Sequence, residues 1–150
     1  MSEEAMSLIT AARRIAPEVL AVREEAEQAR RVPQPLSEII SSAGLYQMFL
    51  PASVGGAEAP PLVALQAIEE LSKADGSVGW CVMIATDISL FTGWLDPKVV
   101  REMCGQPPCL RAAGSLRPMG RAYPVNGGYR VNGQWNFIGF LYQGHFIQRA

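Results

Sequence analysis

Apolar residues recur at three- and four-residue steps along the first part of the chain, which is the spacing of one helix face. Between residues 4 and 31 this stripe predicts a helix. Pro17 lies inside it and has no amide donor, so it marks a kink or the first turn of a new helix. A second helix is expected after Pro33 and Pro35, ending at Gly44, because glycine suits a helix C-cap. The first stripe consists of Leu8, Ala11, Ala12, Ile15, Val19 and Val22.

Three more helices are predicted before residue 105. The first begins at Pro60-Pro61, and Asp75-Gly76-Ser77 ends it and caps an apolar helix from Val78 to about Trp94. Asp96-Pro97, an N-cap residue followed by proline, begins the last helix, which runs to about Cys104. The predicted buried face of the first of these helices is Leu62, Leu65, Ile68 and Leu71.

The remaining segments predict loops and strands. Residues 45–51 are interpreted as an extended apolar linker, and residues 53–57 as a loop with paired glycines. Pro107-Pro108 is a boundary signal, after which the apolar period shortens and Gly, Tyr and Val accumulate. Asn126-Gly127-Gly128 predicts a hairpin turn, and Asn132-Gly133 a second turn. The expected strands are residues 110–116, 122–125, 129–131 and 134–138.

The segment Val78 to Leu95 is apolar enough to raise the question of a membrane span. A spanning helix needs about 20 apolar residues. This segment barely qualifies, and Asp87 would lie near the middle of the bilayer. We therefore expect a buried core helix and no membrane partner.

Composition narrows the class of protein further. The chain has 150 residues, 49% hydrophobic, with a formal net charge of -1, so no basic excess points to nucleic acid. The adjacent pairs Arg13-Arg14 and Arg30-Arg31 are interpreted as solvated helix faces. Three cysteines without C-x-x-C spacing and a single histidine argue against a metal site. An odd cysteine count and an acidic N-terminus without an apolar core suit the cytoplasm.

The sequence contains no self-contained catalytic constellation. His145 stands alone, and the nucleophile-elbow, Gly-x-Gly-x-x-Gly and P-loop patterns are absent. Trp135 and Phe137 share one face of the expected strand, because side chains alternate along a strand. Spacing alone favours a face that packs on the helices. The alternative is a wall for a planar cofactor, against which aromatic rings can pack.

Three segments resemble the acyl-CoA dehydrogenase superfamily. The segment Leu45 to Pro51, followed by Gly55-Gly56, is similar to the family's stretch after its second helix. The segment Ile68 to Trp80 is similar to the family's "E-x-x-A-x-x-D-x-S-x-x-W" junction. Gly120 to Trp135 carries the most specific similarity, to the "G-x-A-x-x-V-x-G-G-Y-x-V-x-G-x-W" hairpin that enters the flavin-binding middle domain. This version resembles most the flavin-dependent hydroxylase branch, the oxygenase components of two-component monooxygenases.

The resemblance implies an α+β chain with two parts: an all-α N-terminal helical bundle, residues 1–108, and an incomplete antiparallel β middle domain, residues 109–150. It implies FAD or FMN as cofactor, a small-molecule substrate that is an acyl-CoA or an aromatic compound, and a homo-oligomer. Dehydrogenases of the family take their catalytic carboxylate from the C-terminal region. In the hydroxylase branch a reduced flavin reacts with oxygen, assisted by histidines.

Five positions carry over as flavin contacts, and none as a catalytic residue. The sequence departs from the family at Gly139 and Phe140, where a hydroxyl-bearing residue is expected, and at Thr86 or Asp87, where the hydroxylase branch carries a histidine. The five contacts are Ser115, Leu116, Trp135, Phe137 and Gly139.

Two functions therefore remain open at the level of the sequence. The first is a truncated flavin-dependent oxidoreductase, inactive alone because the C-terminal catalytic domain is absent. The second is a non-enzymatic helical module for binding or oligomerisation, with Trp80, Trp94 or Met48 as contacts.

Overall fold

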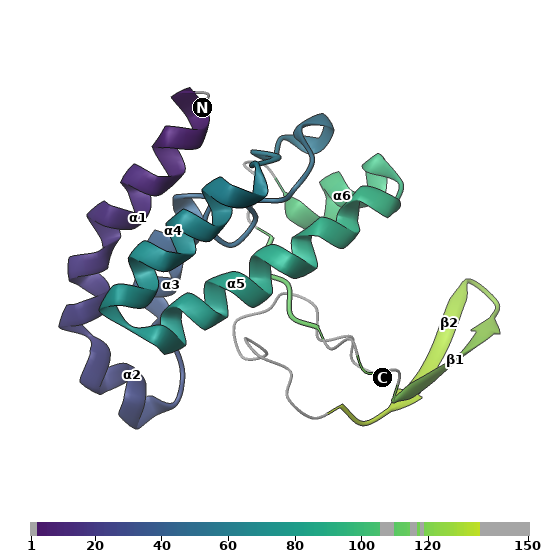
Figure 1. Cartoon of the computed structure of the whole chain (residues 1–150). Coiled ribbons are helices and arrows are strands. Elements are labelled where there is room, and N and C mark those ends of the chain that lie inside the picture. Colours follow the sequence, from purple (N-terminus) through teal and green to yellow (C-terminus); the bar gives the residue numbers. More distant parts are fainter. Residues whose placement is uncertain (1–2, 106–109, 115–116, 118, 136–150) are drawn as a thin grey trace.

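The computed structural model describes residues 3–105, 110–114, 117 and 119–135. Figure 1 shows a group of helices followed by a separate hairpin, with α4 beside α1 and α5 beside α4. This order of helices and then antiparallel strands confirms the predicted α+β class. The helices are α1 (Glu3–Ala21), α2 (Arg23–Ala29), α3 (Gln34–Ser42), α4 (Pro61–Ala74), α5 (Gly76–Leu90) and α6 (Pro97–Cys104), with 3₁₀ turns η1 (Ala52–Val54) and η2 (Phe91–Trp94).

Helix α1 continues through Pro17, so the prediction that a new helix begins there is wrong. Pro17 is exposed, and the carbonyl that loses its amide partner can bond water. The helix ends instead before Val22, whose φ of -105° and ψ of 12° separate α1 from α2. The buried stripe that holds α1 against α4 is Leu8, Ile9, Ala12, Ile15 and Val19.

Helix α2 is shorter than the charged run of its sequence suggests. It ends at Ala29, and Arg30 follows with a φ of 51°, in the left-handed region. The interpretation of Arg30-Arg31 as part of a helix face is therefore wrong, whereas Arg13 and Arg14 are exposed on α1 as expected.

Helix α4 begins at Pro61 as predicted, but its buried face is rotated from the predicted one. Leu62 and Leu65 are 63% and 60% exposed, whereas Leu71 is fully buried. Neighbours α1 and α5 flank the helix, and the small side chains of Ala64 and Ala67 allow close approach. The sequence carries two overlapping apolar stripes here, and packing selects the one with smaller residues. The buried set is Val63, Ala64, Ala67 and Leu71.

Helix α3 ends in a Schellman motif, which confirms the predicted role of Gly44. Gly44 has a φ of 74°, its amide donates to the Ser41 carbonyl at 2.9 Å, and the Leu45 amide donates to the Ile40 carbonyl at 3.2 Å. The following segment forms consecutive turns and is not an extended linker. It is buried in the core because its apolar side chains point inward, with Leu45, Tyr46, Met48 and Leu50 all fully buried.

Helix α5 is capped as predicted. One oxygen of the Asp75 carboxylate accepts hydrogen bonds from the Ser77 and Val78 amides at 2.8 and 3.1 Å. The expected core helix is buried on one face only: Val78, Gly79, Val82, Ala85, Thr86 and Ser89 face the core. By length and composition, residues Gly76–Trp94 would also be able to cross a membrane, and 39% of the most apolar window is buried inside the protein.

Helix α6 confirms the prediction from Asp96-Pro97. The Asp96 carboxylate accepts from the Lys98 amide at 2.7 Å. Beyond α6, residues 110–114 form no strand, although one was expected there. Leu110 and Ala112 instead complete a small second core with residues of η1 and α6, namely Val54, Val100 and Cys104, and with Leu50.

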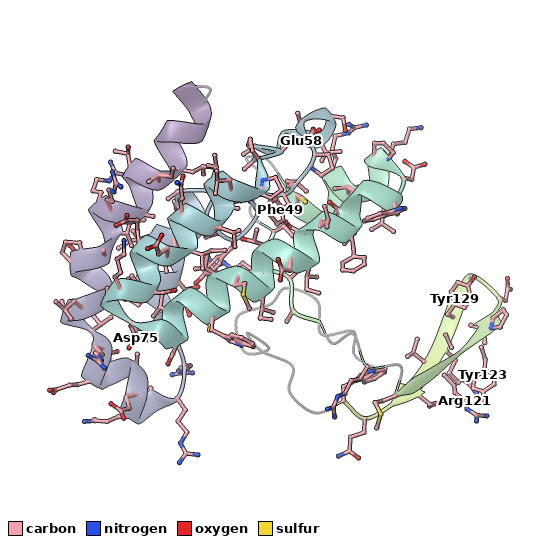
Figure 2. All side chains as sticks on the ribbon, in the orientation of Figure 1. Phe49, Glu58, Asp75, Arg121, Tyr123 and Tyr129 are labelled. Carbon is pink, nitrogen blue, oxygen red and sulfur yellow. The ribbon has the colours of Figure 1, made fainter. Side chains whose placement is uncertain are left out.

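Strands β1 (Gly120–Val125) and β2 (Gly128–Gly133) form an antiparallel hairpin, as predicted. Val125 pairs with Gly128 across Asn126-Gly127, and of the two turn residues only Gly127 has a positive φ, 83°. The second predicted turn is wrong, because Asn132 and Gly133 belong to β2, and Gln134 and Trp135 lie outside any strand. The rest of that expected strand lies outside the described residues. Figure 2 shows Tyr123 and Arg121 on the side of the hairpin that faces away from the helices, whereas Tyr129, which pairs with Pro124, lies on its other face.

Candidate functional site

The segment after α6 brings the chain across α5. A Cβ on Gly114 would lie 2.5 Å from the Ile88 Cδ1 atom, so the backbone passes close to the helix here and a larger residue would require the Ile88 side chain to shift. Ile88 also packs on the core that contains Leu110 and Ala112. Ser115 and Leu116, two predicted flavin contacts, follow directly and lie outside the described residues.

Trp135 lies at the base of the hairpin, against its terminal glycines. A Cβ on Gly120 or Gly133 would approach the indole ring to 2.2 or 2.6 Å, so the ring packs on bare backbone. The indole N–H donates to the Arg117 carbonyl at 3.1 Å, and the side chain stays partly exposed. Trp135 therefore packs on the hairpin itself rather than on the helices. Phe137 and Gly139, its predicted companions, lie outside the described residues.

The outer face of α5 and η2 carries a second apolar stripe. Trp80, Phe91 and Trp94 are 56%, 50% and 74% exposed. The rings of Phe91 and Trp94 are 5.8 Å apart and tilted by 39°. Large exposed aromatics at helical spacing mark a surface for a ligand or another protein segment. Met48 is fully buried, so its predicted role as a contact is wrong.

The two candidates for the family's histidine position differ in accessibility. Thr86 is fully buried, and its hydroxyl donates to the Leu45 carbonyl at 3.0 Å, which ties α5 to the turn after α3. Asp87 is exposed on the outer face, and partial burial raises the pKa of its carboxyl. Only Asp87 can therefore meet a ligand at this position.

Two further groups of the described residues, Cys81 and Tyr46, have pKa values raised by burial. Burial raises the pKa of the Cys81 thiol to about 11, so the thiol is protonated and unreactive at neutral pH. Burial likewise raises the pKa of Tyr46, whose hydroxyl donates to Ser37 Oγ at 3.2 Å. Within the described residues, no three His, Cys, Asp or Glu side chains gather to hold a metal. His145 lies outside the described residues.

The helical bundle, the segment that crosses α5 and the antiparallel hairpin follow the order expected for the N-terminal part of the acyl-CoA dehydrogenase superfamily. The family model described as "Acyl-CoA dehydrogenase, N-terminal domain" matches residues 2–93. The chain belongs to this acyl-CoA dehydrogenase family, and its relatives place it in the hydroxylase-like branch.

Three relatives define that branch. The flavin-dependent monooxygenase, oxygenase subunit HsaA, of Mycobacterium tuberculosis is 29% identical over 89% of this chain and 34% of its own length. The indole-3-acetate monooxygenase of Acinetobacter baumannii is 33% identical over 58% of this chain and 22% of its own length. The crystal structure of 3-HSA hydroxylase from Rhodococcus sp. RHA1 matches with a TM-score of 0.81 and 26% identity, over 95% of this chain and 36% of the other.

The chain thus spans about a third of the length of two of these relatives, 34% of the Mycobacterium tuberculosis subunit and 36% of the solved Rhodococcus chain. The Trp80 and Trp94 stripe was visible in the sequence only as an apolar helix, because a helix that is apolar all round does not reveal which face is covered.

Proposed function

We propose that this chain is part of the oxygenase component of a flavin-dependent monooxygenase that acts on an aromatic small molecule. The observation that carries the proposal is the likeness to 3-HSA hydroxylase over 95% of the chain at a TM-score of 0.81. In this proposal residues 1–108 supply the N-terminal helical domain and residues 109–150 begin the β middle domain. In this proposal the whole protein works as a homo-oligomer in the cytoplasm. The free thiols of Cys81 and Cys104 support a reducing compartment.

The cofactor in this proposal is FAD or FMN, which supplies oxygen activation in its reduced form. Trp135 fits a planar ring, because the glycine backbone holds its indole and leaves it partly exposed. Ser115, Leu116, Phe137 and Gly139 remain proposed contacts beside it. Of Thr86 and Asp87, the two positions proposed to match the branch's histidine, only Asp87 is exposed, so the proton acceptor proposed here is the Asp87 carboxylate, whose pKa is raised.

A chimera tests the proposal. This chain would replace the matching N-terminal third of the Mycobacterium tuberculosis subunit, and hydroxylation of that subunit's substrate would be measured with reduced flavin supplied. We expect measurable turnover that falls when Trp135 is replaced by Ala. A chimera that folds, binds flavin and has no activity above the flavin-only rate contradicts the proposal. The matched control is Tyr129→Ala, which changes an exposed aromatic on the same hairpin.

The chain by itself is expected to bind flavin weakly and to turn over no substrate, because the proposed contacts form only part of a cofactor wall. Flavin fluorescence should change little on titration with the purified chain. Flavin that co-purifies in stoichiometric amount would contradict this expectation.

A second candidate function is a non-enzymatic helical module for binding or oligomerisation. The exposed stripe of Trp80, Phe91 and Trp94 favours it, because such a surface is usually covered. Size-exclusion chromatography with light scattering distinguishes the two. A defined oligomer that dissociates in Trp80→Gln/Trp94→Gln supports a module, and soluble aggregate of undefined size supports the enzyme part.

A further inference from the structure

A cavity lies at the opposite end of the bundle from the hairpin, where α2 meets the first turn of α5. Its volume is about 420 Å³, within the range of small-molecule sites. Figure 2 shows Asp75 at this junction, below α4 and beside α2. The residues that decide its chemistry are Arg23, Arg30, Arg31, Val32, Val78 and Cys81.

The cavity lining carries more positive than negative side chains. Arg23 Nε lies 3.5 Å from Asp75 Oδ2, so this guanidinium already has a partner. Arg30 and Arg31 also line the cavity, and neither makes an ion pair within the part of the chain that the structure describes. The carboxylate of Glu27 is the other acidic group in the lining. Three guanidinium groups against two carboxylates leave one positive charge for a ligand to neutralise.

The end of helix α5 does not supply the binding groups. The Asp75 carboxylate already accepts from the amides of Ser77 and Val78, so these donors are satisfied. Any anion in the cavity must therefore be held by the arginine side chains.

The backbone at Arg30 brings the two unpaired guanidinium groups to the cavity. Arg30 has a φ of 51°, a conformation that favours glycine, and its amide donates to the Ala26 and Glu27 carbonyls to end α2. A long charged residue occupies a position where glycine would relieve strain. Outliers of this kind gather at sites where the side chain is needed.

The inner wall of the cavity is apolar. Ala26 and Cys81 are partly exposed and supply the apolar surface that a ligand can reach. Val32 and Val78 also line the cavity but are only 5% and 1% exposed, and the Cys81 thiol is protonated at neutral pH. An inorganic ion would leave this wall uncovered, whereas an apolar group would remove it from water.

We propose that this cavity binds a small organic anion. Its carboxylate meets the guanidinium groups of Arg30 and Arg31, and its arene or short alkyl body packs on Ala26 and Cys81, next to the buried Val32 and Val78. The site lies apart from Trp135 and does not depend on the proposed oxygenase function.

Titration of the isotope-labelled chain with benzoate tests the proposal by NMR. Saturable shifts are expected at the Val32 and Val78 methyl groups, with inorganic phosphate and benzyl alcohol each binding about tenfold more weakly. Equal binding of phosphate would overturn the apolar part of the proposal. Equal binding of benzyl alcohol would overturn the ionic part, and no saturable shift would overturn both.

Two variants separate binding from folding. Arg30→Gly suits the positive φ and so keeps the fold, but it removes one guanidinium, and Arg31→Gln removes the other charge. Each should weaken benzoate binding by about tenfold. The control is Arg14→Gln, an exposed arginine of α1 outside the cavity, which should leave binding unchanged. Unchanged binding in both cavity variants contradicts the proposal.

Discussion

The indole N–H of Trp135 donates to the carbonyl oxygen of Arg117, 3.1 Å away, and so joins the segment before β1 to the segment after β2. The same indole ring packs on Gly120 and Gly133, which face each other across the hairpin. These contacts close the base of a hairpin whose other residues are exposed.

Replacing Gly133 by Ala should displace the Trp135 ring. A Cβ there would lie 2.6 Å from the ring and 2.7 Å from the Gly120 Cα, so the ring or the strand must shift. We expect a local cost of about 1–3 kcal/mol, as for other overpacked sites. The measurement is the fluorescence maximum of Trp135 in a Trp80→Phe/Trp94→Phe background, which should shift to the red. Gly128→Ala is the control, because a Cβ there meets no atom within 4 Å. An identical spectrum for Gly133→Ala and the parent would contradict the packing.

Thr86→Val should destabilise the helical bundle. The hydroxyl of Thr86 is fully buried and bonds the Leu45 carbonyl across 41 positions, and valine has nearly the same shape. Loss of the donor should lower the free energy of unfolding by about 1–2 kcal/mol, measured in urea. Thr92→Val is the comparison, because Thr92 donates to the Ser89 carbonyl, which also accepts from the backbone amide of Phe91. A larger loss for Thr92→Val than for Thr86→Val would show that the link to Leu45 contributes little.

Asp87→Asn should gain stability over the wild type as pH rises. Partial burial raises the pKa of the Asp87 carboxyl, so the folded chain holds this proton more strongly than the unfolded chain. The stability from this group is complete below its unfolded pKa, near 3.9, and is lost as pH rises through the raised value. The difference between Asp87→Asn and wild type in urea unfolding should therefore grow from pH 3 to pH 7.

Glu70→Gln provides the control of opposite sign. The hydrogen bond from Arg13, with a smaller effect from Lys73, lowers the pKa of the Glu70 carboxyl. Its stabilising contribution is present above the unfolded pKa and is lost as pH falls through the lowered value. Identical pH profiles for the two variants would contradict both assignments.

Arg30→Gly should stabilise the chain slightly. A residue with a side chain costs about 1–2 kcal/mol in the left-handed region, whereas glycine costs about 0.5–1 kcal/mol in unfolded-state entropy. The difference predicts a gain of about 0.5 kcal/mol in urea unfolding. Arg31→Gly serves as the comparison, because Arg31 has no positive φ and glycine there brings only the entropic cost. A loss of stability in Arg30→Gly would show that its guanidinium contributes more to the fold than the backbone strain costs.

Local chemistry in the sequence predicted the helix ends well. Asp75, Asp96 and Gly44 have caps whose partners lie within a few residues, so their roles follow from short-range geometry. The hairpin at Asn126-Gly127 was predictable for the same reason. The new helix expected at Pro17 was wrong, because packing of α1 on α4 outweighs one missing hydrogen bond on an exposed face.

Features that depend on distant neighbours were not predictable. The exposed positions of Leu62 and Leu65 follow from where α1 and α5 approach α4. The cavity at Arg30 depends on a left-handed residue after α2 and on the first turn of α5, which lie more than 40 residues apart in the sequence. Of the five predicted flavin contacts, only Trp135 lies among the described residues, and its role stays a prediction.

The buried and the exposed apolar faces of α5 and η2 tolerate different amino-acid replacements. Polar replacements at Val82 or Ala85 would be lost in a mutational library sorted for folding, since these side chains are fully buried. Replacements at Trp80 or Trp94 would survive the same sort, because solvent already reaches these rings. A library of the whole protein can therefore be sorted first for folding and then for function. If the exposed face is used biologically, the positions lost only in the second sort should recur with the period of a helix.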